Sequence, residues 1–141
     1  MLSKKENEKL TRVGPGTPVG DLLRRYWHPV AIAADLTPEN PTKFVRILGE
    51  NLVLFVTPKG EPGLLHDRCS HRGASLSYGR VEERGLACGY HGWLYDPKGN
   101  CLETPAEPGD SKFCLTVKHK AYPVQKLAGL YWAYFGPQPA P

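Results

Sequence analysis

The chain has 141 residues and a net charge of +4, from 18 basic and 14 acidic residues that are mixed along the sequence. It is long enough to fold as one domain with a sizeable core, its apolar runs are too short to span a bilayer, and four cysteines are too few for a disulfide framework. These features, together with a charged N-terminus that has no signal-peptide pattern, predict a cytoplasmic protein that binds neither membranes nor nucleic acid.

The N-terminal segment predicts a short helical arm. Residues 3–12 are polar and helix-prone, and the Val-Gly-Pro-Gly sequence at 13–16 interrupts them. Thr17 followed by Pro18 is typical of an N-cap with proline at the first helical position. We therefore expect a second short helix over residues 19–26, which should end before Pro29 because the residue that precedes a proline avoids the helical conformation.

From residue 30 onward the sequence predicts an all-β domain. Short runs of β-branched, aromatic and aliphatic residues alternate with turns rich in Gly, Pro, Asn and Asp, such as 49–51 and 96–100. This pattern is typical of an antiparallel β sandwich or a partly open barrel. The expected strands are 30–33, 42–48, 52–57, 63–66, 81–83, 86–87, 93–95, 101–103, 115–118, 122–126 and 130–135.

Two glycine-containing loops each carry one cysteine and one histidine. Cys69 and His71 lie in the first loop, and Cys88 and His91 lie in the second, with residues 72–87 between them. A single zinc ion usually takes ligands from longer spacings, and one intervening residue makes it difficult for Cys69 and His71 to reach the same ion. The spacing favours a 2Fe–2S cluster with two cysteines on one iron and two histidines on the other. A zinc site and a site without metal are the alternatives.

Several motifs in the chain resemble one protein family. The sequence is similar to the N-terminal Rieske domain of a Rieske non-haem iron oxygenase, the large subunit of an aromatic-ring-hydroxylating system, and most similar to the phthalate-dioxygenase-like group. The resemblance runs from about Val13 onward. The motifs that carry it are Arg-Tyr-Trp-His-Pro-Val at 25–30, Cys-Ser-His-Arg-Gly-Ala-Ser-Leu at 69–76, Tyr-Gly-Arg at 78–80, Cys-Gly-Tyr-His-Gly-Trp-Leu-Tyr-Asp at 88–96 and Gly-Leu-Tyr-Trp-Ala-Tyr-Phe-Gly-Pro at 129–137.

The resemblance implies a Rieske-type fold with two cluster-binding loops at one tip. It implies that Cys69, His71, Cys88 and His91 hold a 2Fe–2S cluster that transfers electrons in the catabolism of aromatic compounds. The implied donor is a reductase or ferredoxin, and the implied acceptor is the catalytic domain of the oxygenase or a neighbouring subunit. We expect a single domain over 1–141, with an arm at 1–27 and a β domain at 28–137.

Such oxygenases also need a mononuclear iron held by two histidines and one carboxylate in a separate C-terminal domain. Nothing in this sequence supplies that site, so the chain alone is expected to pass electrons without activating oxygen. We therefore expect the Rieske domain of an oxygenase, an oxidoreductase in its whole form. A stand-alone Rieske ferredoxin is the alternative, and a zinc-stabilised binding module is a remote one.

Residues around the loops suggest how a cluster would be held. Glycines 73, 89 and 92 suit positive φ or close approach of the backbone, and Leu76, Tyr90 and Trp93 are candidates for an apolar shield. High-potential Rieske proteins of respiratory complexes have an extra cysteine in each loop and a serine after the second histidine. Here those positions hold Ala74, Tyr90 and Trp93, although the Tyr95 hydroxyl could serve as a donor.

The remaining candidate residues have ordinary explanations. Cys101 and Cys114 are expected to be structural thiols, and the isolated histidines 28, 66 and 119 are expected to be structural too, with His28 a packing residue. Four arginines lie in or between the loops, at 68, 72, 80 and 84. They could compensate the charge of a cluster or contact an acidic redox partner, or they could be solvated loop charges.

Overall fold

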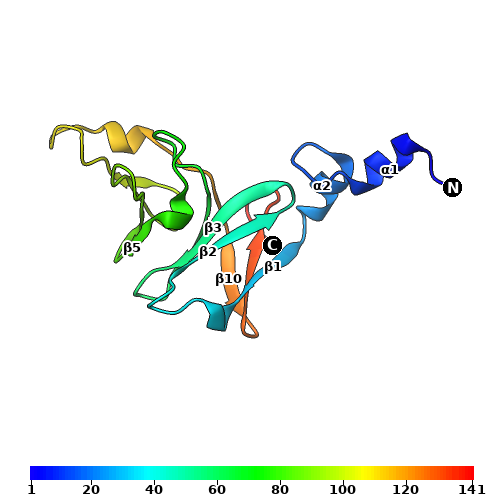
Figure 1. Ribbon diagram of the computed structural model, residues 1–141, viewed down its shortest axis with the longest axis horizontal. Coiled ribbons are helices and arrows are strands. Elements are labelled where there is room, and N and C mark those ends of the chain that lie inside the picture. Colours follow the sequence, from blue (N-terminus) through cyan, green and yellow to red (C-terminus); the bar gives the residue numbers. More distant parts are fainter.

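The computed structural model describes residues 1–141 and consists of three antiparallel sheets with two α-helices at the N-terminus (Figure 1). The all-β, antiparallel fold with a helical arm is therefore confirmed, and the sheets do not close into a barrel. The helices are α1 (Lys4–Thr11) and α2 (Pro18–Leu23). The strands are β1 (Trp27–Ile32), β2 (Thr42–Ile47), β3 (Glu50–Val56), β4 (Pro62–His66), β5 (Arg80–Glu82), β6 (Gly85–Ala87), β7 (Leu94–Tyr95), β8 (Cys101–Glu103), β9 (Ala121–Tyr122), β10 (Val124–Leu127) and β11 (Leu130–Tyr134).

Two of the sheets form the base of the molecule. One has the strand order β2-β3-β4-β9 and the other β1-β11-β10. Their facing side chains form one hydrophobic core, in which Leu52 and Leu54 of β3 pack with Tyr131 and Ala133 of β11. Side chains alternate between the two faces of β2, because Val45 faces this core while Phe44 is exposed.

The third sheet, β5-β6-β7-β8, stands beside the base and supports the two Cys/His loops (Figure 1). A second core lies between it and strands β3 and β4, with Val53 and Phe55 from β3 and Leu86 and Tyr95 from the third sheet. Successive side chains of a strand point to opposite faces, so β3 contributes alternate residues to the two cores. That arrangement explains why β3 is buried on both sides.

The N-terminal helices extend away from the base (Figure 1). In α1, the Ser3 hydroxyl accepts from the Glu6 amide and the Glu6 carboxylate accepts from the Ser3 amide, which is a complete capping box. In α2, Thr17 is the N-cap as expected, with its hydroxyl 3.2 Å from the Gly20 amide. The prediction that this helix continues to residue 26 was wrong, because it ends at Leu23.

Pro29 lies inside strand β1 rather than ahead of it. It pairs with Trp132 of β11, and the register shifts between Pro29 and Ala31. Because β1 is an edge strand of its sheet, a residue without an amide proton is tolerated there. The first strand therefore begins at Trp27, three residues before the expected start at 30.

Two further expectations about local structure were wrong. Residues 115–118 do not form a strand, because the chain makes a 3-10 helix over Phe113–Thr116, where the Thr116 hydroxyl donates to the Phe113 carbonyl at 2.7 Å. The turn between β2 and β3 is made by Leu48 and Gly49, which have φ of 48° and 76°, rather than by residues 49–51. No helix in the structure is long and apolar enough to cross a membrane.

A buried carboxylate joins the arm to the base. The Glu50 side chain accepts a hydrogen bond from Arg24 Nη1 at 2.7 Å and one from the Tyr122 hydroxyl at 2.6 Å, and it also pairs with Lys120. Arg24 and Glu50 are both nearly inaccessible to solvent. Burial acts to raise the pKa of Glu50, but the hydrogen bonds from Lys120, Tyr122 and Arg24 outweigh it and lower that pKa.

Candidate metal centre

The two Cys/His loops lie next to each other at one end of the second core. The first loop (Asp67–Ser75) follows β4, and the second loop (Cys88–Trp93) connects β6 and β7. In each loop the chain reverses direction after the cysteine, and an equivalent pair of backbone hydrogen bonds holds this turn. The Cys69 amide donates to the Ala74 carbonyl and the Gly73 amide donates to the Cys69 carbonyl, both at 2.9 Å. The same bonds recur around Cys88 at 2.8 and 3.0 Å, so the loops share one backbone design.

Glycine is required at the matching position of each loop. Gly73 has φ of 71° and Gly92 has φ of 74°, a left-handed conformation that other residues rarely adopt. A Cβ on Gly92 would also lie 3.3 Å from the Pro105 ring. The conformational role predicted for these two glycines is therefore confirmed, whereas Gly89 does not have a positive φ and instead approaches the Tyr78 carbonyl closely.

The loops separate the sulfurs from the imidazoles. Cys69 and Cys88 are only 4% and 5% exposed and belong to the second core, whereas His71 is partly exposed and His91 is exposed. The two imidazole rings lie beside each other, with centroids 4.7 Å apart. The thiols interact as well: burial raises the pKa of Cys69, and the neighbouring Cys88 thiol adds to that rise. The site thus presents a buried pair of sulfurs and an outward pair of nitrogens.

This donor set fits a cluster with two irons better than it fits one ion. No group of three or more His, Cys, Asp or Glu side chains is arranged to hold a single metal ion. A structural zinc site would need four converging ligands, whereas a Rieske cluster needs two protein ligands on each iron, because bridging sulfides complete the coordination. Two soft thiols on the buried side and two imidazoles on the outer side match that division of ligands.

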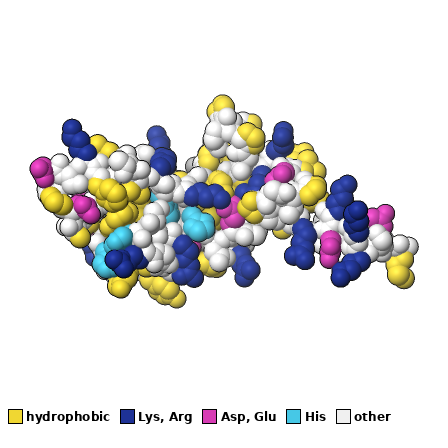
Figure 2. Space-filling view, turned by 90° about the horizontal axis from the view of Figure 1, so that it is seen from above, with side chains coloured by type: hydrophobic (Ala, Val, Ile, Leu, Met, Phe, Trp, Pro, Cys, Tyr) yellow, Lys and Arg dark blue, Asp and Glu magenta, His cyan; other side chains and the backbone are white.

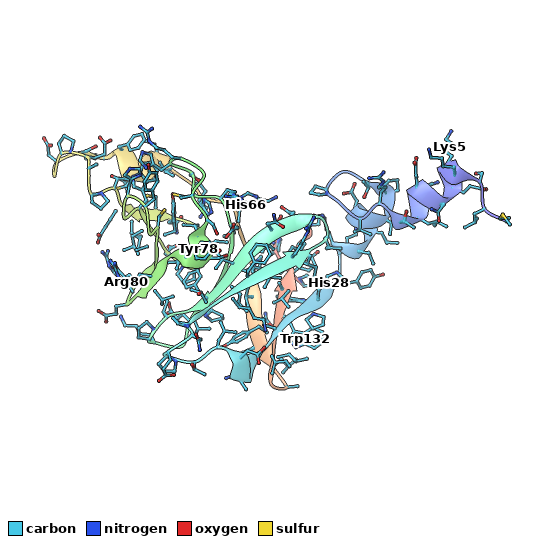
Figure 3. All side chains as sticks on the ribbon, viewed as in Figure 1. Lys5, His28, His66, Tyr78, Arg80 and Trp132 are labelled. Atoms are coloured by element: carbon cyan, nitrogen blue, oxygen red, sulfur yellow. The ribbon has the colours of Figure 1, made fainter.

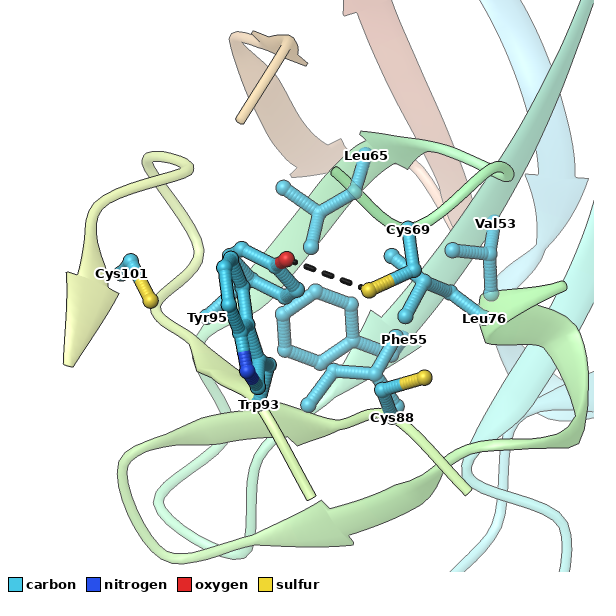
Figure 4. Packing of buried hydrophobic residues seen from close by; sticks show 10 residues of the cluster. Val53, Phe55, Leu65, Cys69, Leu76, Cys88, Trp93, Tyr95 and Cys101 are labelled. Atoms are coloured by element: carbon cyan, nitrogen blue, oxygen red, sulfur yellow. Dashed lines mark hydrogen bonds between the residues drawn. The ribbon is translucent and has the colours of Figure 1, made fainter. Parts of the chain in front are cut away.

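The Tyr95 hydroxyl group contacts the sulfur of Cys69. The distance is 3.2 Å, and the tyrosine is fully buried behind the loops (Figure 4). Burial and the contact with Cys69 raise the pKa of Tyr95 far above its ordinary value, so the hydroxyl keeps its proton. A sulfur bonded to iron is a thiolate and can only accept, so the Tyr95 hydroxyl is then the donor. The donor role considered for Tyr95 is therefore geometrically available.

The expected apolar shield is only partly present. Leu76 is fully buried and Trp93 is 6% exposed, and the Trp93 ring stacks on His71 at 4.5 Å with the planes 5° apart. Tyr90, in contrast, is 65% exposed and lies against His91, with ring centroids 3.8 Å apart. The prediction that Tyr90 belongs to the apolar shield was wrong. Tyr90 follows Gly89 at the outer edge of the second loop, where no element covers it.

The four arginines near the loops have different partners. Arg80 pairs with Glu82 on the same strand and Arg84 pairs with Glu103, so these two act as surface ion pairs. Arg68 donates from Nη1 to a carbonyl inside the first loop at 3.3 Å. Arg72 has no ion pair and lies beside His71, where partial burial and the charges of His91 and Arg72 lower the pKa of His71. Figure 2 shows histidine side chains with Lys and Arg beside them on the surface of this half of the molecule.

The cysteines outside the loops are placed as expected. Cys101 is buried in the second core and Cys114 packs against that core, and no disulfide joins any of the four cysteines of the chain. Burial raises the pKa of Cys101 to about 11, with Cys114 adding to the rise, so its thiol stays protonated and unreactive at neutral pH. His28 is a packing residue, since its Nε2 lies 2.7 Å from the Leu23 carbonyl and its ring lies beside Phe135.

Two buried residues at the first loop have partners that the sequence did not indicate. Asp67 accepts hydrogen bonds from the Ser75 hydroxyl at 2.8 Å and from the Ser77 hydroxyl at 2.6 Å, which closes the loop at its base. His119 is 2% exposed and contacts Ser70 inside the loop. An aspartate two residues before the Cys-x-His motif was the only signal for the first. His119 was expected to be structural, but nothing indicated its partners, because they are distant in sequence.

The fold and the paired loops define an electron-transfer iron–sulfur domain. The Rieske [2Fe-2S] domain family matches residues 26–125. The chain is 49% identical to the oxygenase subunit of 5,5'-dehydrodivanillate O-demethylase from Sphingobium sp., over 100% of this chain and 34% of the relative. It is 43% identical to the oxygenase subunit of phthalate 4,5-dioxygenase from Pseudomonas putida, over 99% of this chain and 32% of the relative.

Solved structures agree with these sequence relationships. NdmA from Pseudomonas putida CBB5 superposes with a TM-score of 0.72 and 36% identity, over 80% of this chain and 35% of that chain. The chain therefore belongs to the Rieske [2Fe-2S] domain family, and its relatives are Rieske oxygenase subunits. Its cofactor is a Rieske 2Fe–2S cluster, and its role is electron transfer through that cluster. The chain spans about a third of the length of the curated relatives that it matches.

Proposed function

We propose that Cys69 and Cys88 bind one iron of the cluster and that His71 and His91 bind the other. The observation that carries this assignment is the pairing of two buried sulfurs with two outward imidazoles on loops of one backbone design. When bound, the cluster supplies one-electron transfer between a donor and an acceptor.

The residues around the site then have distinct tasks. The second core excludes water from the sulfur side, and the Tyr95 hydroxyl and the His71 backbone amide direct donors at the Cys69 sulfur. On the other side, His71 and His91 present imidazole edges to the surface, where a partner protein can approach. The arrangement supports an electron path that enters and leaves through the imidazole side rather than through the core.

We further propose that the chain functions as the Rieske domain of an aromatic-ring-hydroxylating oxygenase subunit. A reductase or ferredoxin would reduce it, and the acceptor would be the mononuclear iron of the catalytic domain in the same or a neighbouring subunit. The relatives support this, because they are oxygenase subunits about three times as long as the chain. We propose that residues 1–27 and 28–137 act as arm and β domain of one unit, in the cytoplasm, where cysteines without disulfide bonds are stable.

The ligand assignment is tested by metal analysis and spectroscopy. The purified protein should contain two irons and two acid-labile sulfides per chain, with a Rieske-type EPR signal after reduction. Cys69→Ala and Cys88→Ala should each abolish the cluster. Cys101→Ser is the matched control, a buried thiol in the same core, and should retain it. Stoichiometric zinc without sulfide, or a full cluster in Cys69→Ala, would refute the assignment.

The division of labour is tested by turnover. With a competent reductase, NADH, ferrous iron and a panel of aromatic acids, the 141-residue chain should be reduced but should form no hydroxylated product. This follows because histidines outside the loops have other partners: His28 contacts the Leu23 carbonyl, and His119 contacts the His66 carbonyl and the Ser70 hydroxyl, so neither is free to hold a mononuclear iron. Product formation coupled to NADH use would contradict the proposal.

A further inference from the structure

A buried histidine connects the first loop to the tyrosine behind it. His119 Nδ1 lies 2.7 Å from the Ser70 hydroxyl, and Ser70 stands between Cys69 and His71. The other ring nitrogen, Nε2, lies 2.7 Å from the carbonyl oxygen of His66, at the end of β4. Figure 3 labels His66 where the base meets the half of the molecule that carries the loops. His119 thus holds the strand that leads into the loop and a residue within the loop.

The partners of His119 determine its tautomer. The His66 carbonyl can only accept a hydrogen bond, so Nε2 must carry a proton. Burial lowers the pKa of His119, which favours the neutral ring. In a neutral ring with a proton on Nε2, Nδ1 has a lone pair and accepts from the Ser70 hydroxyl. Both nitrogens are therefore satisfied, and the orientation of the ring in its plane is fixed.

The face of the same ring lies against Tyr95. The ring centroids of His119 and Tyr95 are 4.6 Å apart, with an angle of 34° between the planes. The Tyr95 side chain has two rotatable bonds, so the position of its hydroxyl depends on the packing of its ring as well as on the groups that the hydroxyl contacts, which include the Cys69 sulfur. A change in the position of the His119 ring would therefore move the Tyr95 hydroxyl away from the sulfur.

The backbone around His119 is also anchored. The His119 amide donates to the Gly99 carbonyl at 2.7 Å, and the next carbonyl, that of Lys120, accepts from the His66 amide at 2.8 Å. A side chain at Gly99 would collide with this segment, since its Cβ would lie 2.1 Å from the His119 carbonyl oxygen. The ring is thus attached to a rigid support between the β7–β8 hairpin and β4.

We propose that His119 is a positioning residue for the electron-transfer site. It holds the Tyr95 ring so that the hydroxyl donates to the Cys69 sulfur, and through that bond it raises the reduction potential of the cluster. A donor to a ligand sulfur stabilises the reduced state, which carries one more negative charge. This inference rests on the proposed assignment of Cys69 as a ligand.

The test compares midpoint potentials of the cluster-loaded protein. His119→Gln removes the ring that faces Tyr95 but keeps an amide donor for the His66 carbonyl. We expect it to lower the midpoint potential in the same direction as Tyr95→Phe, with full cluster content. The double variant should shift no further than Tyr95→Phe alone, because both changes remove the same hydrogen bond.

A matched control uses the same substitution elsewhere. His28 also contacts a backbone carbonyl through Nε2 and lies beside an aromatic ring, but it belongs to β1, well away from His66 (Figure 3). His28→Gln should leave the potential unchanged. If the His119→Gln protein does not hold a cluster, Ser70→Ala is used in its place, because it removes the hydroxyl that donates to Nδ1 of His119. Its midpoint potential is then compared with that of Tyr95→Phe in the same way.

Two results would overturn the inference. One is an unchanged potential in His119→Gln, or in Ser70→Ala where that variant is used. The other is a shift that adds in full to that of Tyr95→Phe, because His119 would then act by another route. Failure of the ligand assignment is a separate outcome, recognised by a cluster that persists in Cys69→Ala.

Discussion

Replacing Tyr95 by Phe removes one oxygen atom from the core and leaves the packing of the ring unchanged. The lost contact is the hydroxyl 3.2 Å from the Cys69 sulfur. A hydrogen bond to a neutral group contributes about 0.5–1.5 kcal/mol net, and one to a charged group about 1.5–3 kcal/mol. Only the difference between the oxidised and reduced states affects the potential, and we take it as about 0.5–1.5 kcal/mol. For a one-electron couple, 1.4 kcal/mol corresponds to about 59 mV, so the potential should fall by roughly 20–65 mV.

Protein-film voltammetry of the cluster-loaded variant measures this shift directly. Iron and sulfide content should stay at the wild-type level, because the tyrosine is not a ligand. The wild-type potential itself should lie near the lower end of the roughly −150 to +300 mV Rieske range, because Ala74, Tyr90 and Trp93 replace the disulfide and the serine of high-potential proteins. An unchanged or raised potential in Tyr95→Phe would refute the reasoning from the hydroxyl, and a wild-type midpoint well above zero would refute the argument from the missing groups.

Two further predictions concern stability. Glu50→Gln should lower the free energy of unfolding by roughly 3 kcal/mol at neutral pH, because it leaves Arg24 buried without its charge partner. Hydrogen bonds lower the pKa of Glu50 in the folded state, so its contribution is present above its unfolded pKa of about 4.3 and is lost as the pH falls through the folded pKa. The gap in unfolding temperature between wild type and variant should therefore narrow in acid, and a gap independent of pH would contradict this. Gly85→Ala should cost about 3 kcal/mol and reduce cluster content, because its Cβ would lie 1.9 Å from a carbonyl oxygen of β7, whereas Gly109→Ala meets no atom within 4 Å and should change stability by less than about 0.5 kcal/mol.

Local sequence patterns predicted most of the fold correctly. The strand runs at 42–48 and 52–57, and the turn residues at 96–100, predicted hairpins that the structure contains. Expectations failed where tertiary context outweighed the local signal. Pro29 should not extend a central strand, but β1 is an edge strand and accepts it. Residues 115–118 look like a strand, but the chain forms a 3-10 helix over Phe113–Thr116 with Leu115 76% exposed, and the segment pairs with its neighbour only through an isolated bridge between Lys118 and Asn100.

The candidate site was predictable for a similar reason. Cys69, His71, Cys88 and His91 fall in two short motifs, so their chemistry is visible in the sequence without the fold. The residues that support them are not. His119 is contacted by Ser70 and Tyr95, and Asp67 by Ser77, through contacts that only the folded chain creates. A buried polar side chain is defined by its partners, and sequence spacing does not give partners at long range.

The positions of the two loop cysteines have a consequence for the stability of the protein in the cell. Cys69 follows β4 and Cys88 follows β6, so a group bonded to both sulfurs closes a ring of the chain between them, as a disulfide would. Closing a loop of about this length removes conformational entropy from the unfolded chain that is worth roughly 3 kcal/mol. With Cys69 and Cys88 as the proposed ligands, iron or sulfide starvation would therefore produce a less stable chain that unfolds more often and is degraded faster.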